Sequence, residues 1–160
     1  MKRLAVIGVL AAGCGPAAGA ATVTASLSMD MTITAACTVT SAPALDFGSQ
    51  GLLTSRIDVT ATLGVLCTKG SGYNILLDAG ANSGNTLVRL MAGTPSGFVG
   101  YQIYRDVART QVWGNKMGSD TVSATGAGVE QSFILYGRVP AQTARPVGAY
   151  ADTIRITISY

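Results

Sequence analysis

The chain has 160 residues, about the length of one domain, and a net charge of +3. Charged residues make up 12% of it and hydrophobic residues 48%, a balance that excludes a disordered chain. It has no histidine, which removes the commonest general base, every histidine-containing triad and the usual zinc ligand sets. We therefore expect no enzyme and no metal or cofactor site, and the small net charge gives no indication of a nucleic-acid partner.

The first twenty residues have the pattern of a secretory signal peptide. Two basic residues precede an apolar run at 4–12, and small residues then lead to Ala18-x-Ala20. This run is too short for a membrane anchor, which needs roughly 20 apolar residues. A lipoprotein signal at Cys14 is an alternative with a poorer fit to the preceding residues. We predict export, with cleavage after Ala20 or Ala21.

The stretch 22–40 alternates more regularly than any other part of the chain. All its odd positions are apolar, and its even positions are polar except Ala36. Nineteen extended residues span ~60 Å, whereas a domain of about 140 residues has a diameter of roughly 35–40 Å. The first half is therefore expected to project and to need the sheet edge of another copy to cover it. An ordinary first strand with a bend at Ala35-Ala36 is the alternative.

Two cysteines remain once a signal peptide has been removed, Cys37 and Cys67. In an exported chain they predict one disulfide. A loop of about 30 residues closed in this way stabilises the fold by ~3.5 kcal/mol on the chain-entropy model. A metal site is disfavoured because two thiolates without any histidine lack the remaining ligands.

The rest of the chain predicts short strands separated by turns. Between Ile57 and Cys67 the odd positions are all apolar, which indicates a strand with one face in a core. Further strands are expected at 73–78, 86–91, 98–105, 130–139 and 149–160, with turn-rich stretches at 79–85, 93–97 and 123–128. Seven or so short strands in an exported chain predict an all-β protein, an antiparallel sandwich.

The last expected strand has an apolar phase that nothing later in the chain would cover. Its members are Tyr150, Ile154, Ile156, Ile158 and Tyr160. A sandwich with one strand missing at its end and one spare at its start fits head-to-tail assembly that does not close on itself. This arrangement predicts a fibre.

Several short motifs beyond the N-terminal stretch are shared with a known family. They are Cys37-Thr38-Val39, Leu45-Asp46-Phe47-Gly48, and residues 65–70, 73–80, 136–142, 146–154 and 160. Together with the Thr- and Ser-rich first strand, they resemble the spore coat protein U domain. That family includes the pilins of archaic (Csu-type) chaperone–usher pili.

The resemblance implies an incomplete immunoglobulin-like sandwich over residues 35–160 that lacks its last strand. Residues 21–34 would be a donor strand that completes the next subunit, and Cys37–Cys67 would be the family's disulfide. The implied donor side chains are those of Val23, Ala25, Leu27, Met29, Met31 and Ile33. The implied acceptor groove is lined or bordered by Ile154, Ile156, Ile158 and Tyr160.

The implied partners are other pilin subunits, a periplasmic chaperone that lends a strand, and an outer-membrane usher that assembles the subunits. The expected protein is thus a structural subunit, exported through the periplasm to a cell-surface fimbrium of adhesion or biofilm type, or secreted. A shaft or adaptor position is expected, because the chain has no room for the second domain of a tip adhesin.

Other classes fit the residues less well. A secreted coat or surface-layer sandwich that closes on itself stays open as an alternative, and a small outer-membrane β-barrel is disfavoured because aromatics total 6% and form no paired girdles. A hydrolase would need converging carboxylates, whereas the acidic residues are dispersed and each is expected to be solvated. We expect Trp113 in the core, and Arg138 and Arg155 on the sheet surface or at the groove edge.

Overall fold

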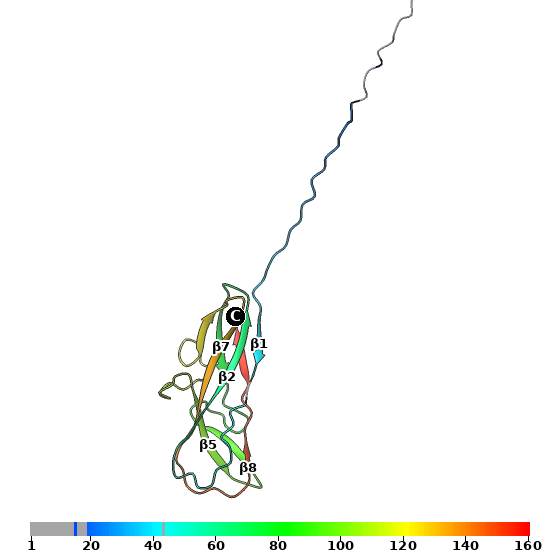
Figure 1. Cartoon of the computed structure of the whole chain (residues 1–160). Coiled ribbons are helices and arrows are strands. Elements are labelled where there is room, and N and C mark those ends of the chain that lie inside the picture. The colour runs from blue at the N-terminus through cyan, green and yellow to red at the C-terminus, as the bar shows by residue number, and fades with distance from the viewer. Residues whose placement is uncertain (1–14, 16–18, 43) are drawn as a thin grey trace, which may run out of the picture. The chain divides into compact units, whose positions relative to one another are not determined.

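The computed structural model describes residues 15, 19–42 and 44–160, and Figure 1 shows the chain. The predicted signal peptide lies mostly outside the described residues. Within the described ranges, no helix is long and apolar enough to cross a bilayer. The chain divides after Thr32 into two units, which are taken separately below.

Nine strands, counted over the described residues, form two antiparallel sheets. All their pairings are antiparallel, as the sequence predicted. The larger sheet has the order β1 (Cys37–Ser41), β2 (Ile57–Cys67), β7 (Glu130–Val139), β5 (Phe98–Tyr104), β4 (Arg89–Thr94), β8 (Ala149–Ala151). The smaller sheet has the order β6 (Val122–Thr125), β3 (Gly72–Leu77), β9 (Ile156–Ser159).

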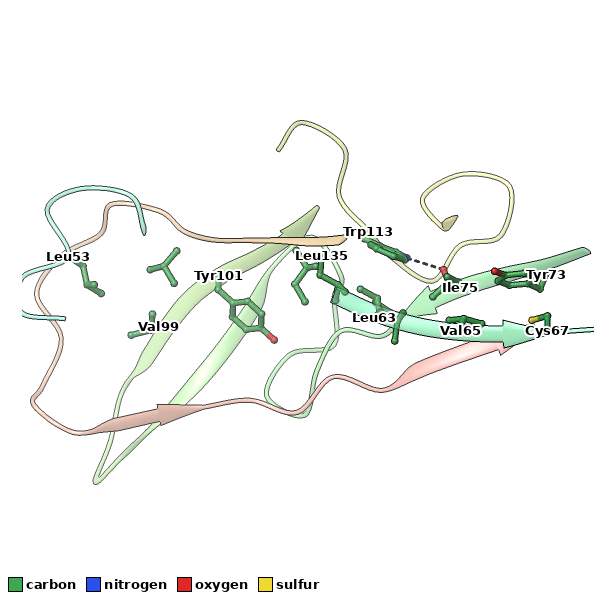
Figure 2. Close-up of a cluster of buried hydrophobic side chains, with 13 residues drawn as sticks. Leu53, Leu63, Val65, Cys67, Tyr73, Ile75, Val99, Tyr101, Trp113 and Leu135 are labelled. Carbon is green, nitrogen blue, oxygen red and sulfur yellow. Dashed lines mark hydrogen bonds between the residues drawn. The ribbon is translucent and has the colours of Figure 1, made fainter. Parts of the chain in front are cut away.

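The hydrophobic core draws side chains from both sheets (Figure 2). Leu63 and Val65 of β2 and Ile75 of β3 are fully buried. Trp113 is in the core as predicted, 1% exposed, and its Nε1 donates a hydrogen bond to the carbonyl of Ile75 at 2.9 Å. The apolar phase of each strand thus faces a shared interior, which is the arrangement of a sandwich.

The two long strands were predicted with their correct bounds. β2 and β7 pair in continuous register, from Ile57 opposite Val139 to Leu66 opposite Glu130. Both are interior strands of the larger sheet, so their alternation between apolar and polar residues is a direct record of one buried and one exposed face.

The prediction of a single strand over 149–160 was wrong. β8 pairs with β4 in the larger sheet, whereas β9 pairs with β3 in the smaller one. The chain therefore changes sheets between Ala151 and Ile156. The apolar phase continues through the change because both strands turn that face to the same core.

The prediction of a turn at 123–128 was also wrong for the first half of this range. Val122–Thr125 forms β6, an edge strand on β3. Its serine and threonine are exposed while Val122 and Ala124 pack against the core. Small polar residues suit the open face of an edge strand as well as a turn, so composition alone misled the prediction.

The strand expected at 22–40 forms only from Cys37 onward. Residues 19–36, all of which are described, belong to no strand. Their large apolar side chains are at least 75% exposed, namely Val23, Leu27, Met29, Met31 and Ile33.

Candidate strand-acceptor edge

The smaller sheet has an open edge along β9. This strand pairs with β3 on one side, and no described strand pairs with its other side. The ladder with β3 continues to Arg155, because the Asp78 N–H donates to the Arg155 carbonyl at 3.1 Å. The Arg155 N–H in turn donates to Asp78 Oδ1 at 2.9 Å.

These bonds fix which backbone groups face the open edge. Polar main-chain groups alternate in direction along an antiparallel strand. Since those of Arg155 point to β3, those of Ile154, Ile156 and Ile158 point away from β3. The side chains of these three isoleucines are partly buried against the core. The edge therefore offers free main-chain donors and acceptors beside a half-covered apolar row, which is what strand addition requires.

The end of β9 and the start of β1 lie at the same end of the sandwich. Cys37 pairs with Cys67 at the end of β2, and Asn74, just after the following turn, pairs with Ser159. Strands β1 and β9 are also in contact. Figure 1 marks the C-terminus beside the start of β1. The open edge thus runs alongside β1, the first strand of the described residues.

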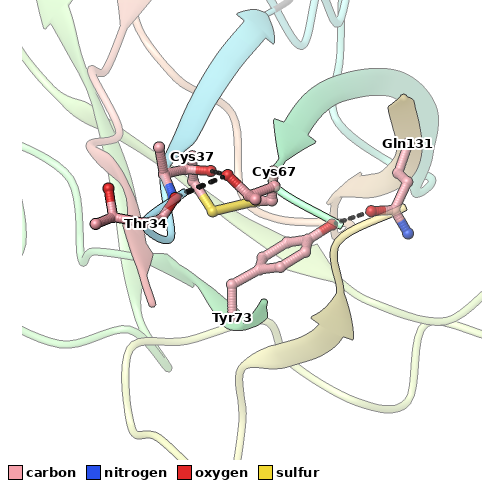
Figure 3. The surroundings of a disulfide bond; sticks show 7 residues. Thr34, Cys37, Cys67, Tyr73 and Gln131 are labelled. Atoms are coloured by element: carbon pink, nitrogen blue, oxygen red, sulfur yellow. Dashed lines mark hydrogen bonds between the residues drawn. A yellow bond between two sulfur atoms is a disulfide. The ribbon is translucent and has the colours of Figure 1, made fainter. Parts of the chain in front are cut away.

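The predicted disulfide between Cys37 and Cys67 is present (Figure 3). The two residues are register partners, with their Cα atoms 4.1 Å apart. Sequence reasoning missed the neighbouring Thr68. Its N–H donates to the Ala36 carbonyl at 2.9 Å, and its Oγ1 accepts from the Ala36 N–H at 3.1 Å. The disulfide and Thr68 together tie the chain to the end of β2 just before β1 begins.

Several carboxylates predicted to be merely solvated have structural roles, and the prediction was wrong for them. Asp152 accepts hydrogen bonds from the Tyr101 hydroxyl at 2.6 Å and from the Ala81 N–H at 2.9 Å, where the chain changes sheets. Burial, and the hydrogen bond to Asp152, raise the pKa of Tyr101. Among the described residues, no group of three or more His, Cys, Asp or Glu side chains could hold a metal ion.

Arg89 is a buried residue that sequence reasoning also missed. Its guanidinium is fully buried and donates to the Asp78 carbonyl at 2.7 Å, the Trp113 carbonyl at 2.8 Å and Gln102 Oε1 at 3.0 Å. Burial lowers the pKa of Arg89. These acceptors come from separate parts of the chain, and nothing local to residue 89 indicates them. Arg89 joins the two sheets and offers no open site.

The two arginines expected at the sheet surface differ in their surroundings. Arg138 forms a two-pronged pair with Asp58 across β2 and β7, with Nε–Oδ1 and Nη2–Oδ2 distances of 2.7 and 2.8 Å. The hydrogen bond from Arg138 lowers the pKa of Asp58. Arg155 is exposed, and within the described part of the chain its side chain takes part in no ion pair.

The structure thus brings together three of the four predicted acceptor residues. Ile154, Ile156 and Ile158 share the apolar row on the open edge, while Tyr160 is 61% exposed beyond it. The predicted donor residues contribute no side chain to the core, and all of them except Ile33 lie in the other unit of the chain. The donor and acceptor roles both stay predictions.

Comparison with known proteins adds a family and a fold. The sequence model of the Spore Coat Protein U domain matches residues 21–157. "Protein U" of Myxococcus xanthus is 31% identical over 158 residues, covering 89% of this chain and 88% of that protein.

A solved structure with a similar fold is a chain of the CsuC–CsuE chaperone–tip adhesion subunit pre-assembly complex, from archaic chaperone–usher Csu pili of Acinetobacter baumannii. The TM-score is 0.61 at 18% identity, with 81% of this chain covered. The match spans 41% of the length of that solved chain. At this identity the likeness is one of fold.

Proposed function

Because the chain belongs to the Spore Coat Protein U domain family, we propose that it is an exported structural subunit of a surface fibre. In this proposal residues 1–20 direct export, residues 21–34 are a donor strand, and residues 35–160 form the sandwich. The donor strand of one copy completes the open β9 edge of the next. No catalysis is assigned to the protein.

The observation that carries the proposal is that one chain has both an open sheet edge and an unpaired apolar segment that could complete such an edge. The β9 edge has exposed main-chain groups beside the half-buried Ile154, Ile156 and Ile158. Residues 21–34 have a regular apolar phase, belong to no strand, and expose that phase to water. Burying its five large apolar side chains at ~2 kcal/mol each gives roughly 10 kcal/mol before the costs of ordering and association.

A second copy supports this pairing better than the chain's own segment. Residues 22–40 contain no Gly, Pro or Asn at which a tight reversal would form. Residue 36 is moreover held to the end of β2 by Thr68 and precedes the disulfide at Cys37. Insertion into another copy needs no reversal and repeats without closing, which produces a fibre.

Two assembly partners are part of the proposal. An open apolar edge is an aggregation hazard before assembly, so a periplasmic chaperone would cover it and an outer-membrane usher would exchange that cover for a donor strand. The solved chain of similar fold is in a chaperone–subunit pre-assembly complex, and this supports the choice of partners. The destination is the cell surface, as a fimbrium of adhesion or biofilm type.

The proposal is tested by placing one charge on either phase of the donor segment. Leu27→Asp puts a carboxylate into the apolar row and should abolish fibres, because an unpaired charge is costly in a dry interface. Ser28→Asp adds the same charge on the polar phase and should still assemble. The measurements are size-exclusion chromatography and negative-stain microscopy of the purified mature protein and both variants.

Deletion of residues 21–34 should leave a folded sandwich that does not polymerise. Fibres formed by this deletion, or by Leu27→Asp, would contradict the proposal. A wild-type protein that stays a stable monomer, with its β9 edge protected from amide exchange, would favour the self-closing coat protein instead.

A further inference from the structure

The donor segment and the acceptor edge each carry a single charged side chain. Asp30 is the only charged residue in 21–36, and Arg155 is the only one in 153–160. The two charges are opposite in sign. Both side chains are exposed, and none of the ion pairs among the described residues includes either of them.

Each charge also lies on the polar phase of its segment. Asp30 lies between Met29 and Met31, whose phase is apolar, and Arg155 lies between Ile154 and Ile156. When the apolar phases of two paired strands face the same core, their polar phases share the opposite face. Asp30 and Arg155 would then lie on the same outer face of the completed sheet.

The orientation of the incoming strand follows from the ends of the sandwich. β9 runs toward the end where β1 begins, as the pairings of Cys37 with Cys67 and of Asn74 with Ser159 require. A donor antiparallel to β9 brings its own sandwich to the opposite end. A parallel donor would bring it to the end where the acceptor's own chain enters β1. Every pairing in the two sheets is antiparallel as well.

We infer that Asp30 of one copy pairs with Arg155 of the next and sets the register of the donor strand. This inference rests on the proposed function and names the contact that positions its donor. In the antiparallel register that results, Met31 lies opposite Ile154, Met29 opposite Ile156 and Leu27 opposite Ile158. Three large apolar side chains of the donor then meet the three half-buried isoleucines of the acceptor.

The apolar row alone does not choose this register. Because side chains alternate with a period of two, a slip of two residues keeps every apolar side chain on the core face. A slip in one direction places Asp30 opposite Thr153 and Arg155 opposite Ser28. A slip in the other places Asp30 opposite Thr157 and Arg155 opposite Thr32. The charge pair is lost in either slipped register, so it distinguishes arrangements that the apolar row leaves similar.

The main-chain geometry also favours contact between the two charges. The N–H and C=O groups of Arg155 are directed to Asp78 of the adjoining strand, not to the open edge. Residue 155 therefore occupies a non-hydrogen-bonded position toward the donor. Directly opposite side chains approach most closely at such positions.

A charge-reversal exchange tests the pair. Asp30→Arg and Arg155→Asp should each slow fibre growth about two- to fivefold, the range expected for like charges that replace a cross-strand pair. The double variant should regain the wild-type rate within about twofold. Ser28→Arg is the control, because it adds a positive charge to the donor and leaves Asp30 and Arg155 in place. The melting temperature of Arg155→Asp shows whether that variant is folded. Added salt should slow wild-type growth more than that of Asp30→Arg.

Disulfide crosslinking between engineered cysteines of two copies measures the register directly. Ser28→Cys with Thr157→Cys should form the intermolecular crosslink. Ser26→Cys with Thr157→Cys and Ser28→Cys with Ser159→Cys, which match the two registers slipped by two residues, should not. A crosslink through either slipped pair, or a double charge variant as slow as the single ones, would overturn the inference. If Leu27→Asp still abolishes fibres in that case, the proposed function stands without this register. If Leu27→Asp assembles, both fail.

Discussion

Residues 21–34 and β2 have the same alternating pattern, but only β2 forms a strand. In β2, the backbone pairs with β7 from Ile57 to Leu66 and with β1 from Gly64 to Cys67, and Leu63 and Val65 are fully buried. In residues 21–34 no strand forms, and Leu27 and Met29 are 84% and 86% exposed. Alternation therefore specifies which face of a segment is apolar and would be buried in a core. Whether a strand forms depends on a neighbour that supplies hydrogen bonds.

The open β9 edge lies between these two extremes. It has a neighbour on one side, and its isoleucines are only partly buried. The sandwich lacks a strand to pair with this edge, and residues 21–34 lack a strand to pair with. Each could supply the hydrogen-bonding neighbour that the other needs. Three measurements test this contrast between the two regions.

The largest effect is expected from matched charges in the two regions. Val65→Asp buries an unpaired carboxylate and should lower the free energy of unfolding by about 4 kcal/mol or more. Met29→Asp makes a similar change in the donor segment and should leave the melting temperature of the monomeric protein unchanged. Thermal unfolding followed by circular dichroism compares the two. A large loss of stability with Met29→Asp would show that the segment belongs to the core of its own chain.

A smaller effect is expected from removing the disulfide between β1 and β2. Replacing both Cys37 and Cys67 with serine should lower the free energy of unfolding by ~3.5 kcal/mol, because the unfolded chain regains the entropy of an open loop. Urea unfolding of the monomer measures this loss. Thr40→Ser, a small change in β1 outside the disulfide, serves as the control. An unchanged unfolding midpoint in the double serine variant would contradict the expectation.

The smallest effect is expected on the exposed face of β2. The hydrogen bond from Arg138 lowers the pKa of Asp58, so this pair stabilises the fold above the ordinary carboxyl pKa. That contribution is lost as the pH falls through the ordinary value toward the lowered one. Asp58→Asn should cost less than about 1 kcal/mol at pH 7, as surface pairs do.

The difference between wild type and Asp58→Asn should vanish at pH 2 in chemical denaturation. Glu130→Gln, an exposed carboxylate in none of the ion pairs described, is the control. A difference that persists at pH 2 would mean that Asp58 acts through something other than its charge.

Much of the sandwich was predictable because its information is local. Interior strands such as β2 and β7 carry their buried face in every second residue, and a turn former closes each end. The disulfide followed from counting cysteines in an exported chain. Trp113 was predicted in the core because a large aromatic side chain is seldom left in water.

Other features were not predictable because they depend on residues distant in the sequence. Arg89 is held by the carbonyls of Asp78 and Trp113 and by Gln102, which only the folded chain brings together. The change of sheets after Ala151 leaves the alternation intact, so it has no local signature. β6 is polar on one face, so its composition indicates a turn, and only its pairing with β3 identifies it as a strand.

The candidate site likewise has features that the sequence predicts and features that depend on the fold. The order of residues already shows which side chains share an apolar phase, in residues 21–34 and again from Ile154 to Tyr160. Only the folded chain shows that the second set lies on a sheet edge with which no other described strand pairs, and that the backbone of every second residue there points outward. Side-chain phase is a local property of the chain, but an open edge is defined by the strand that is absent beside it.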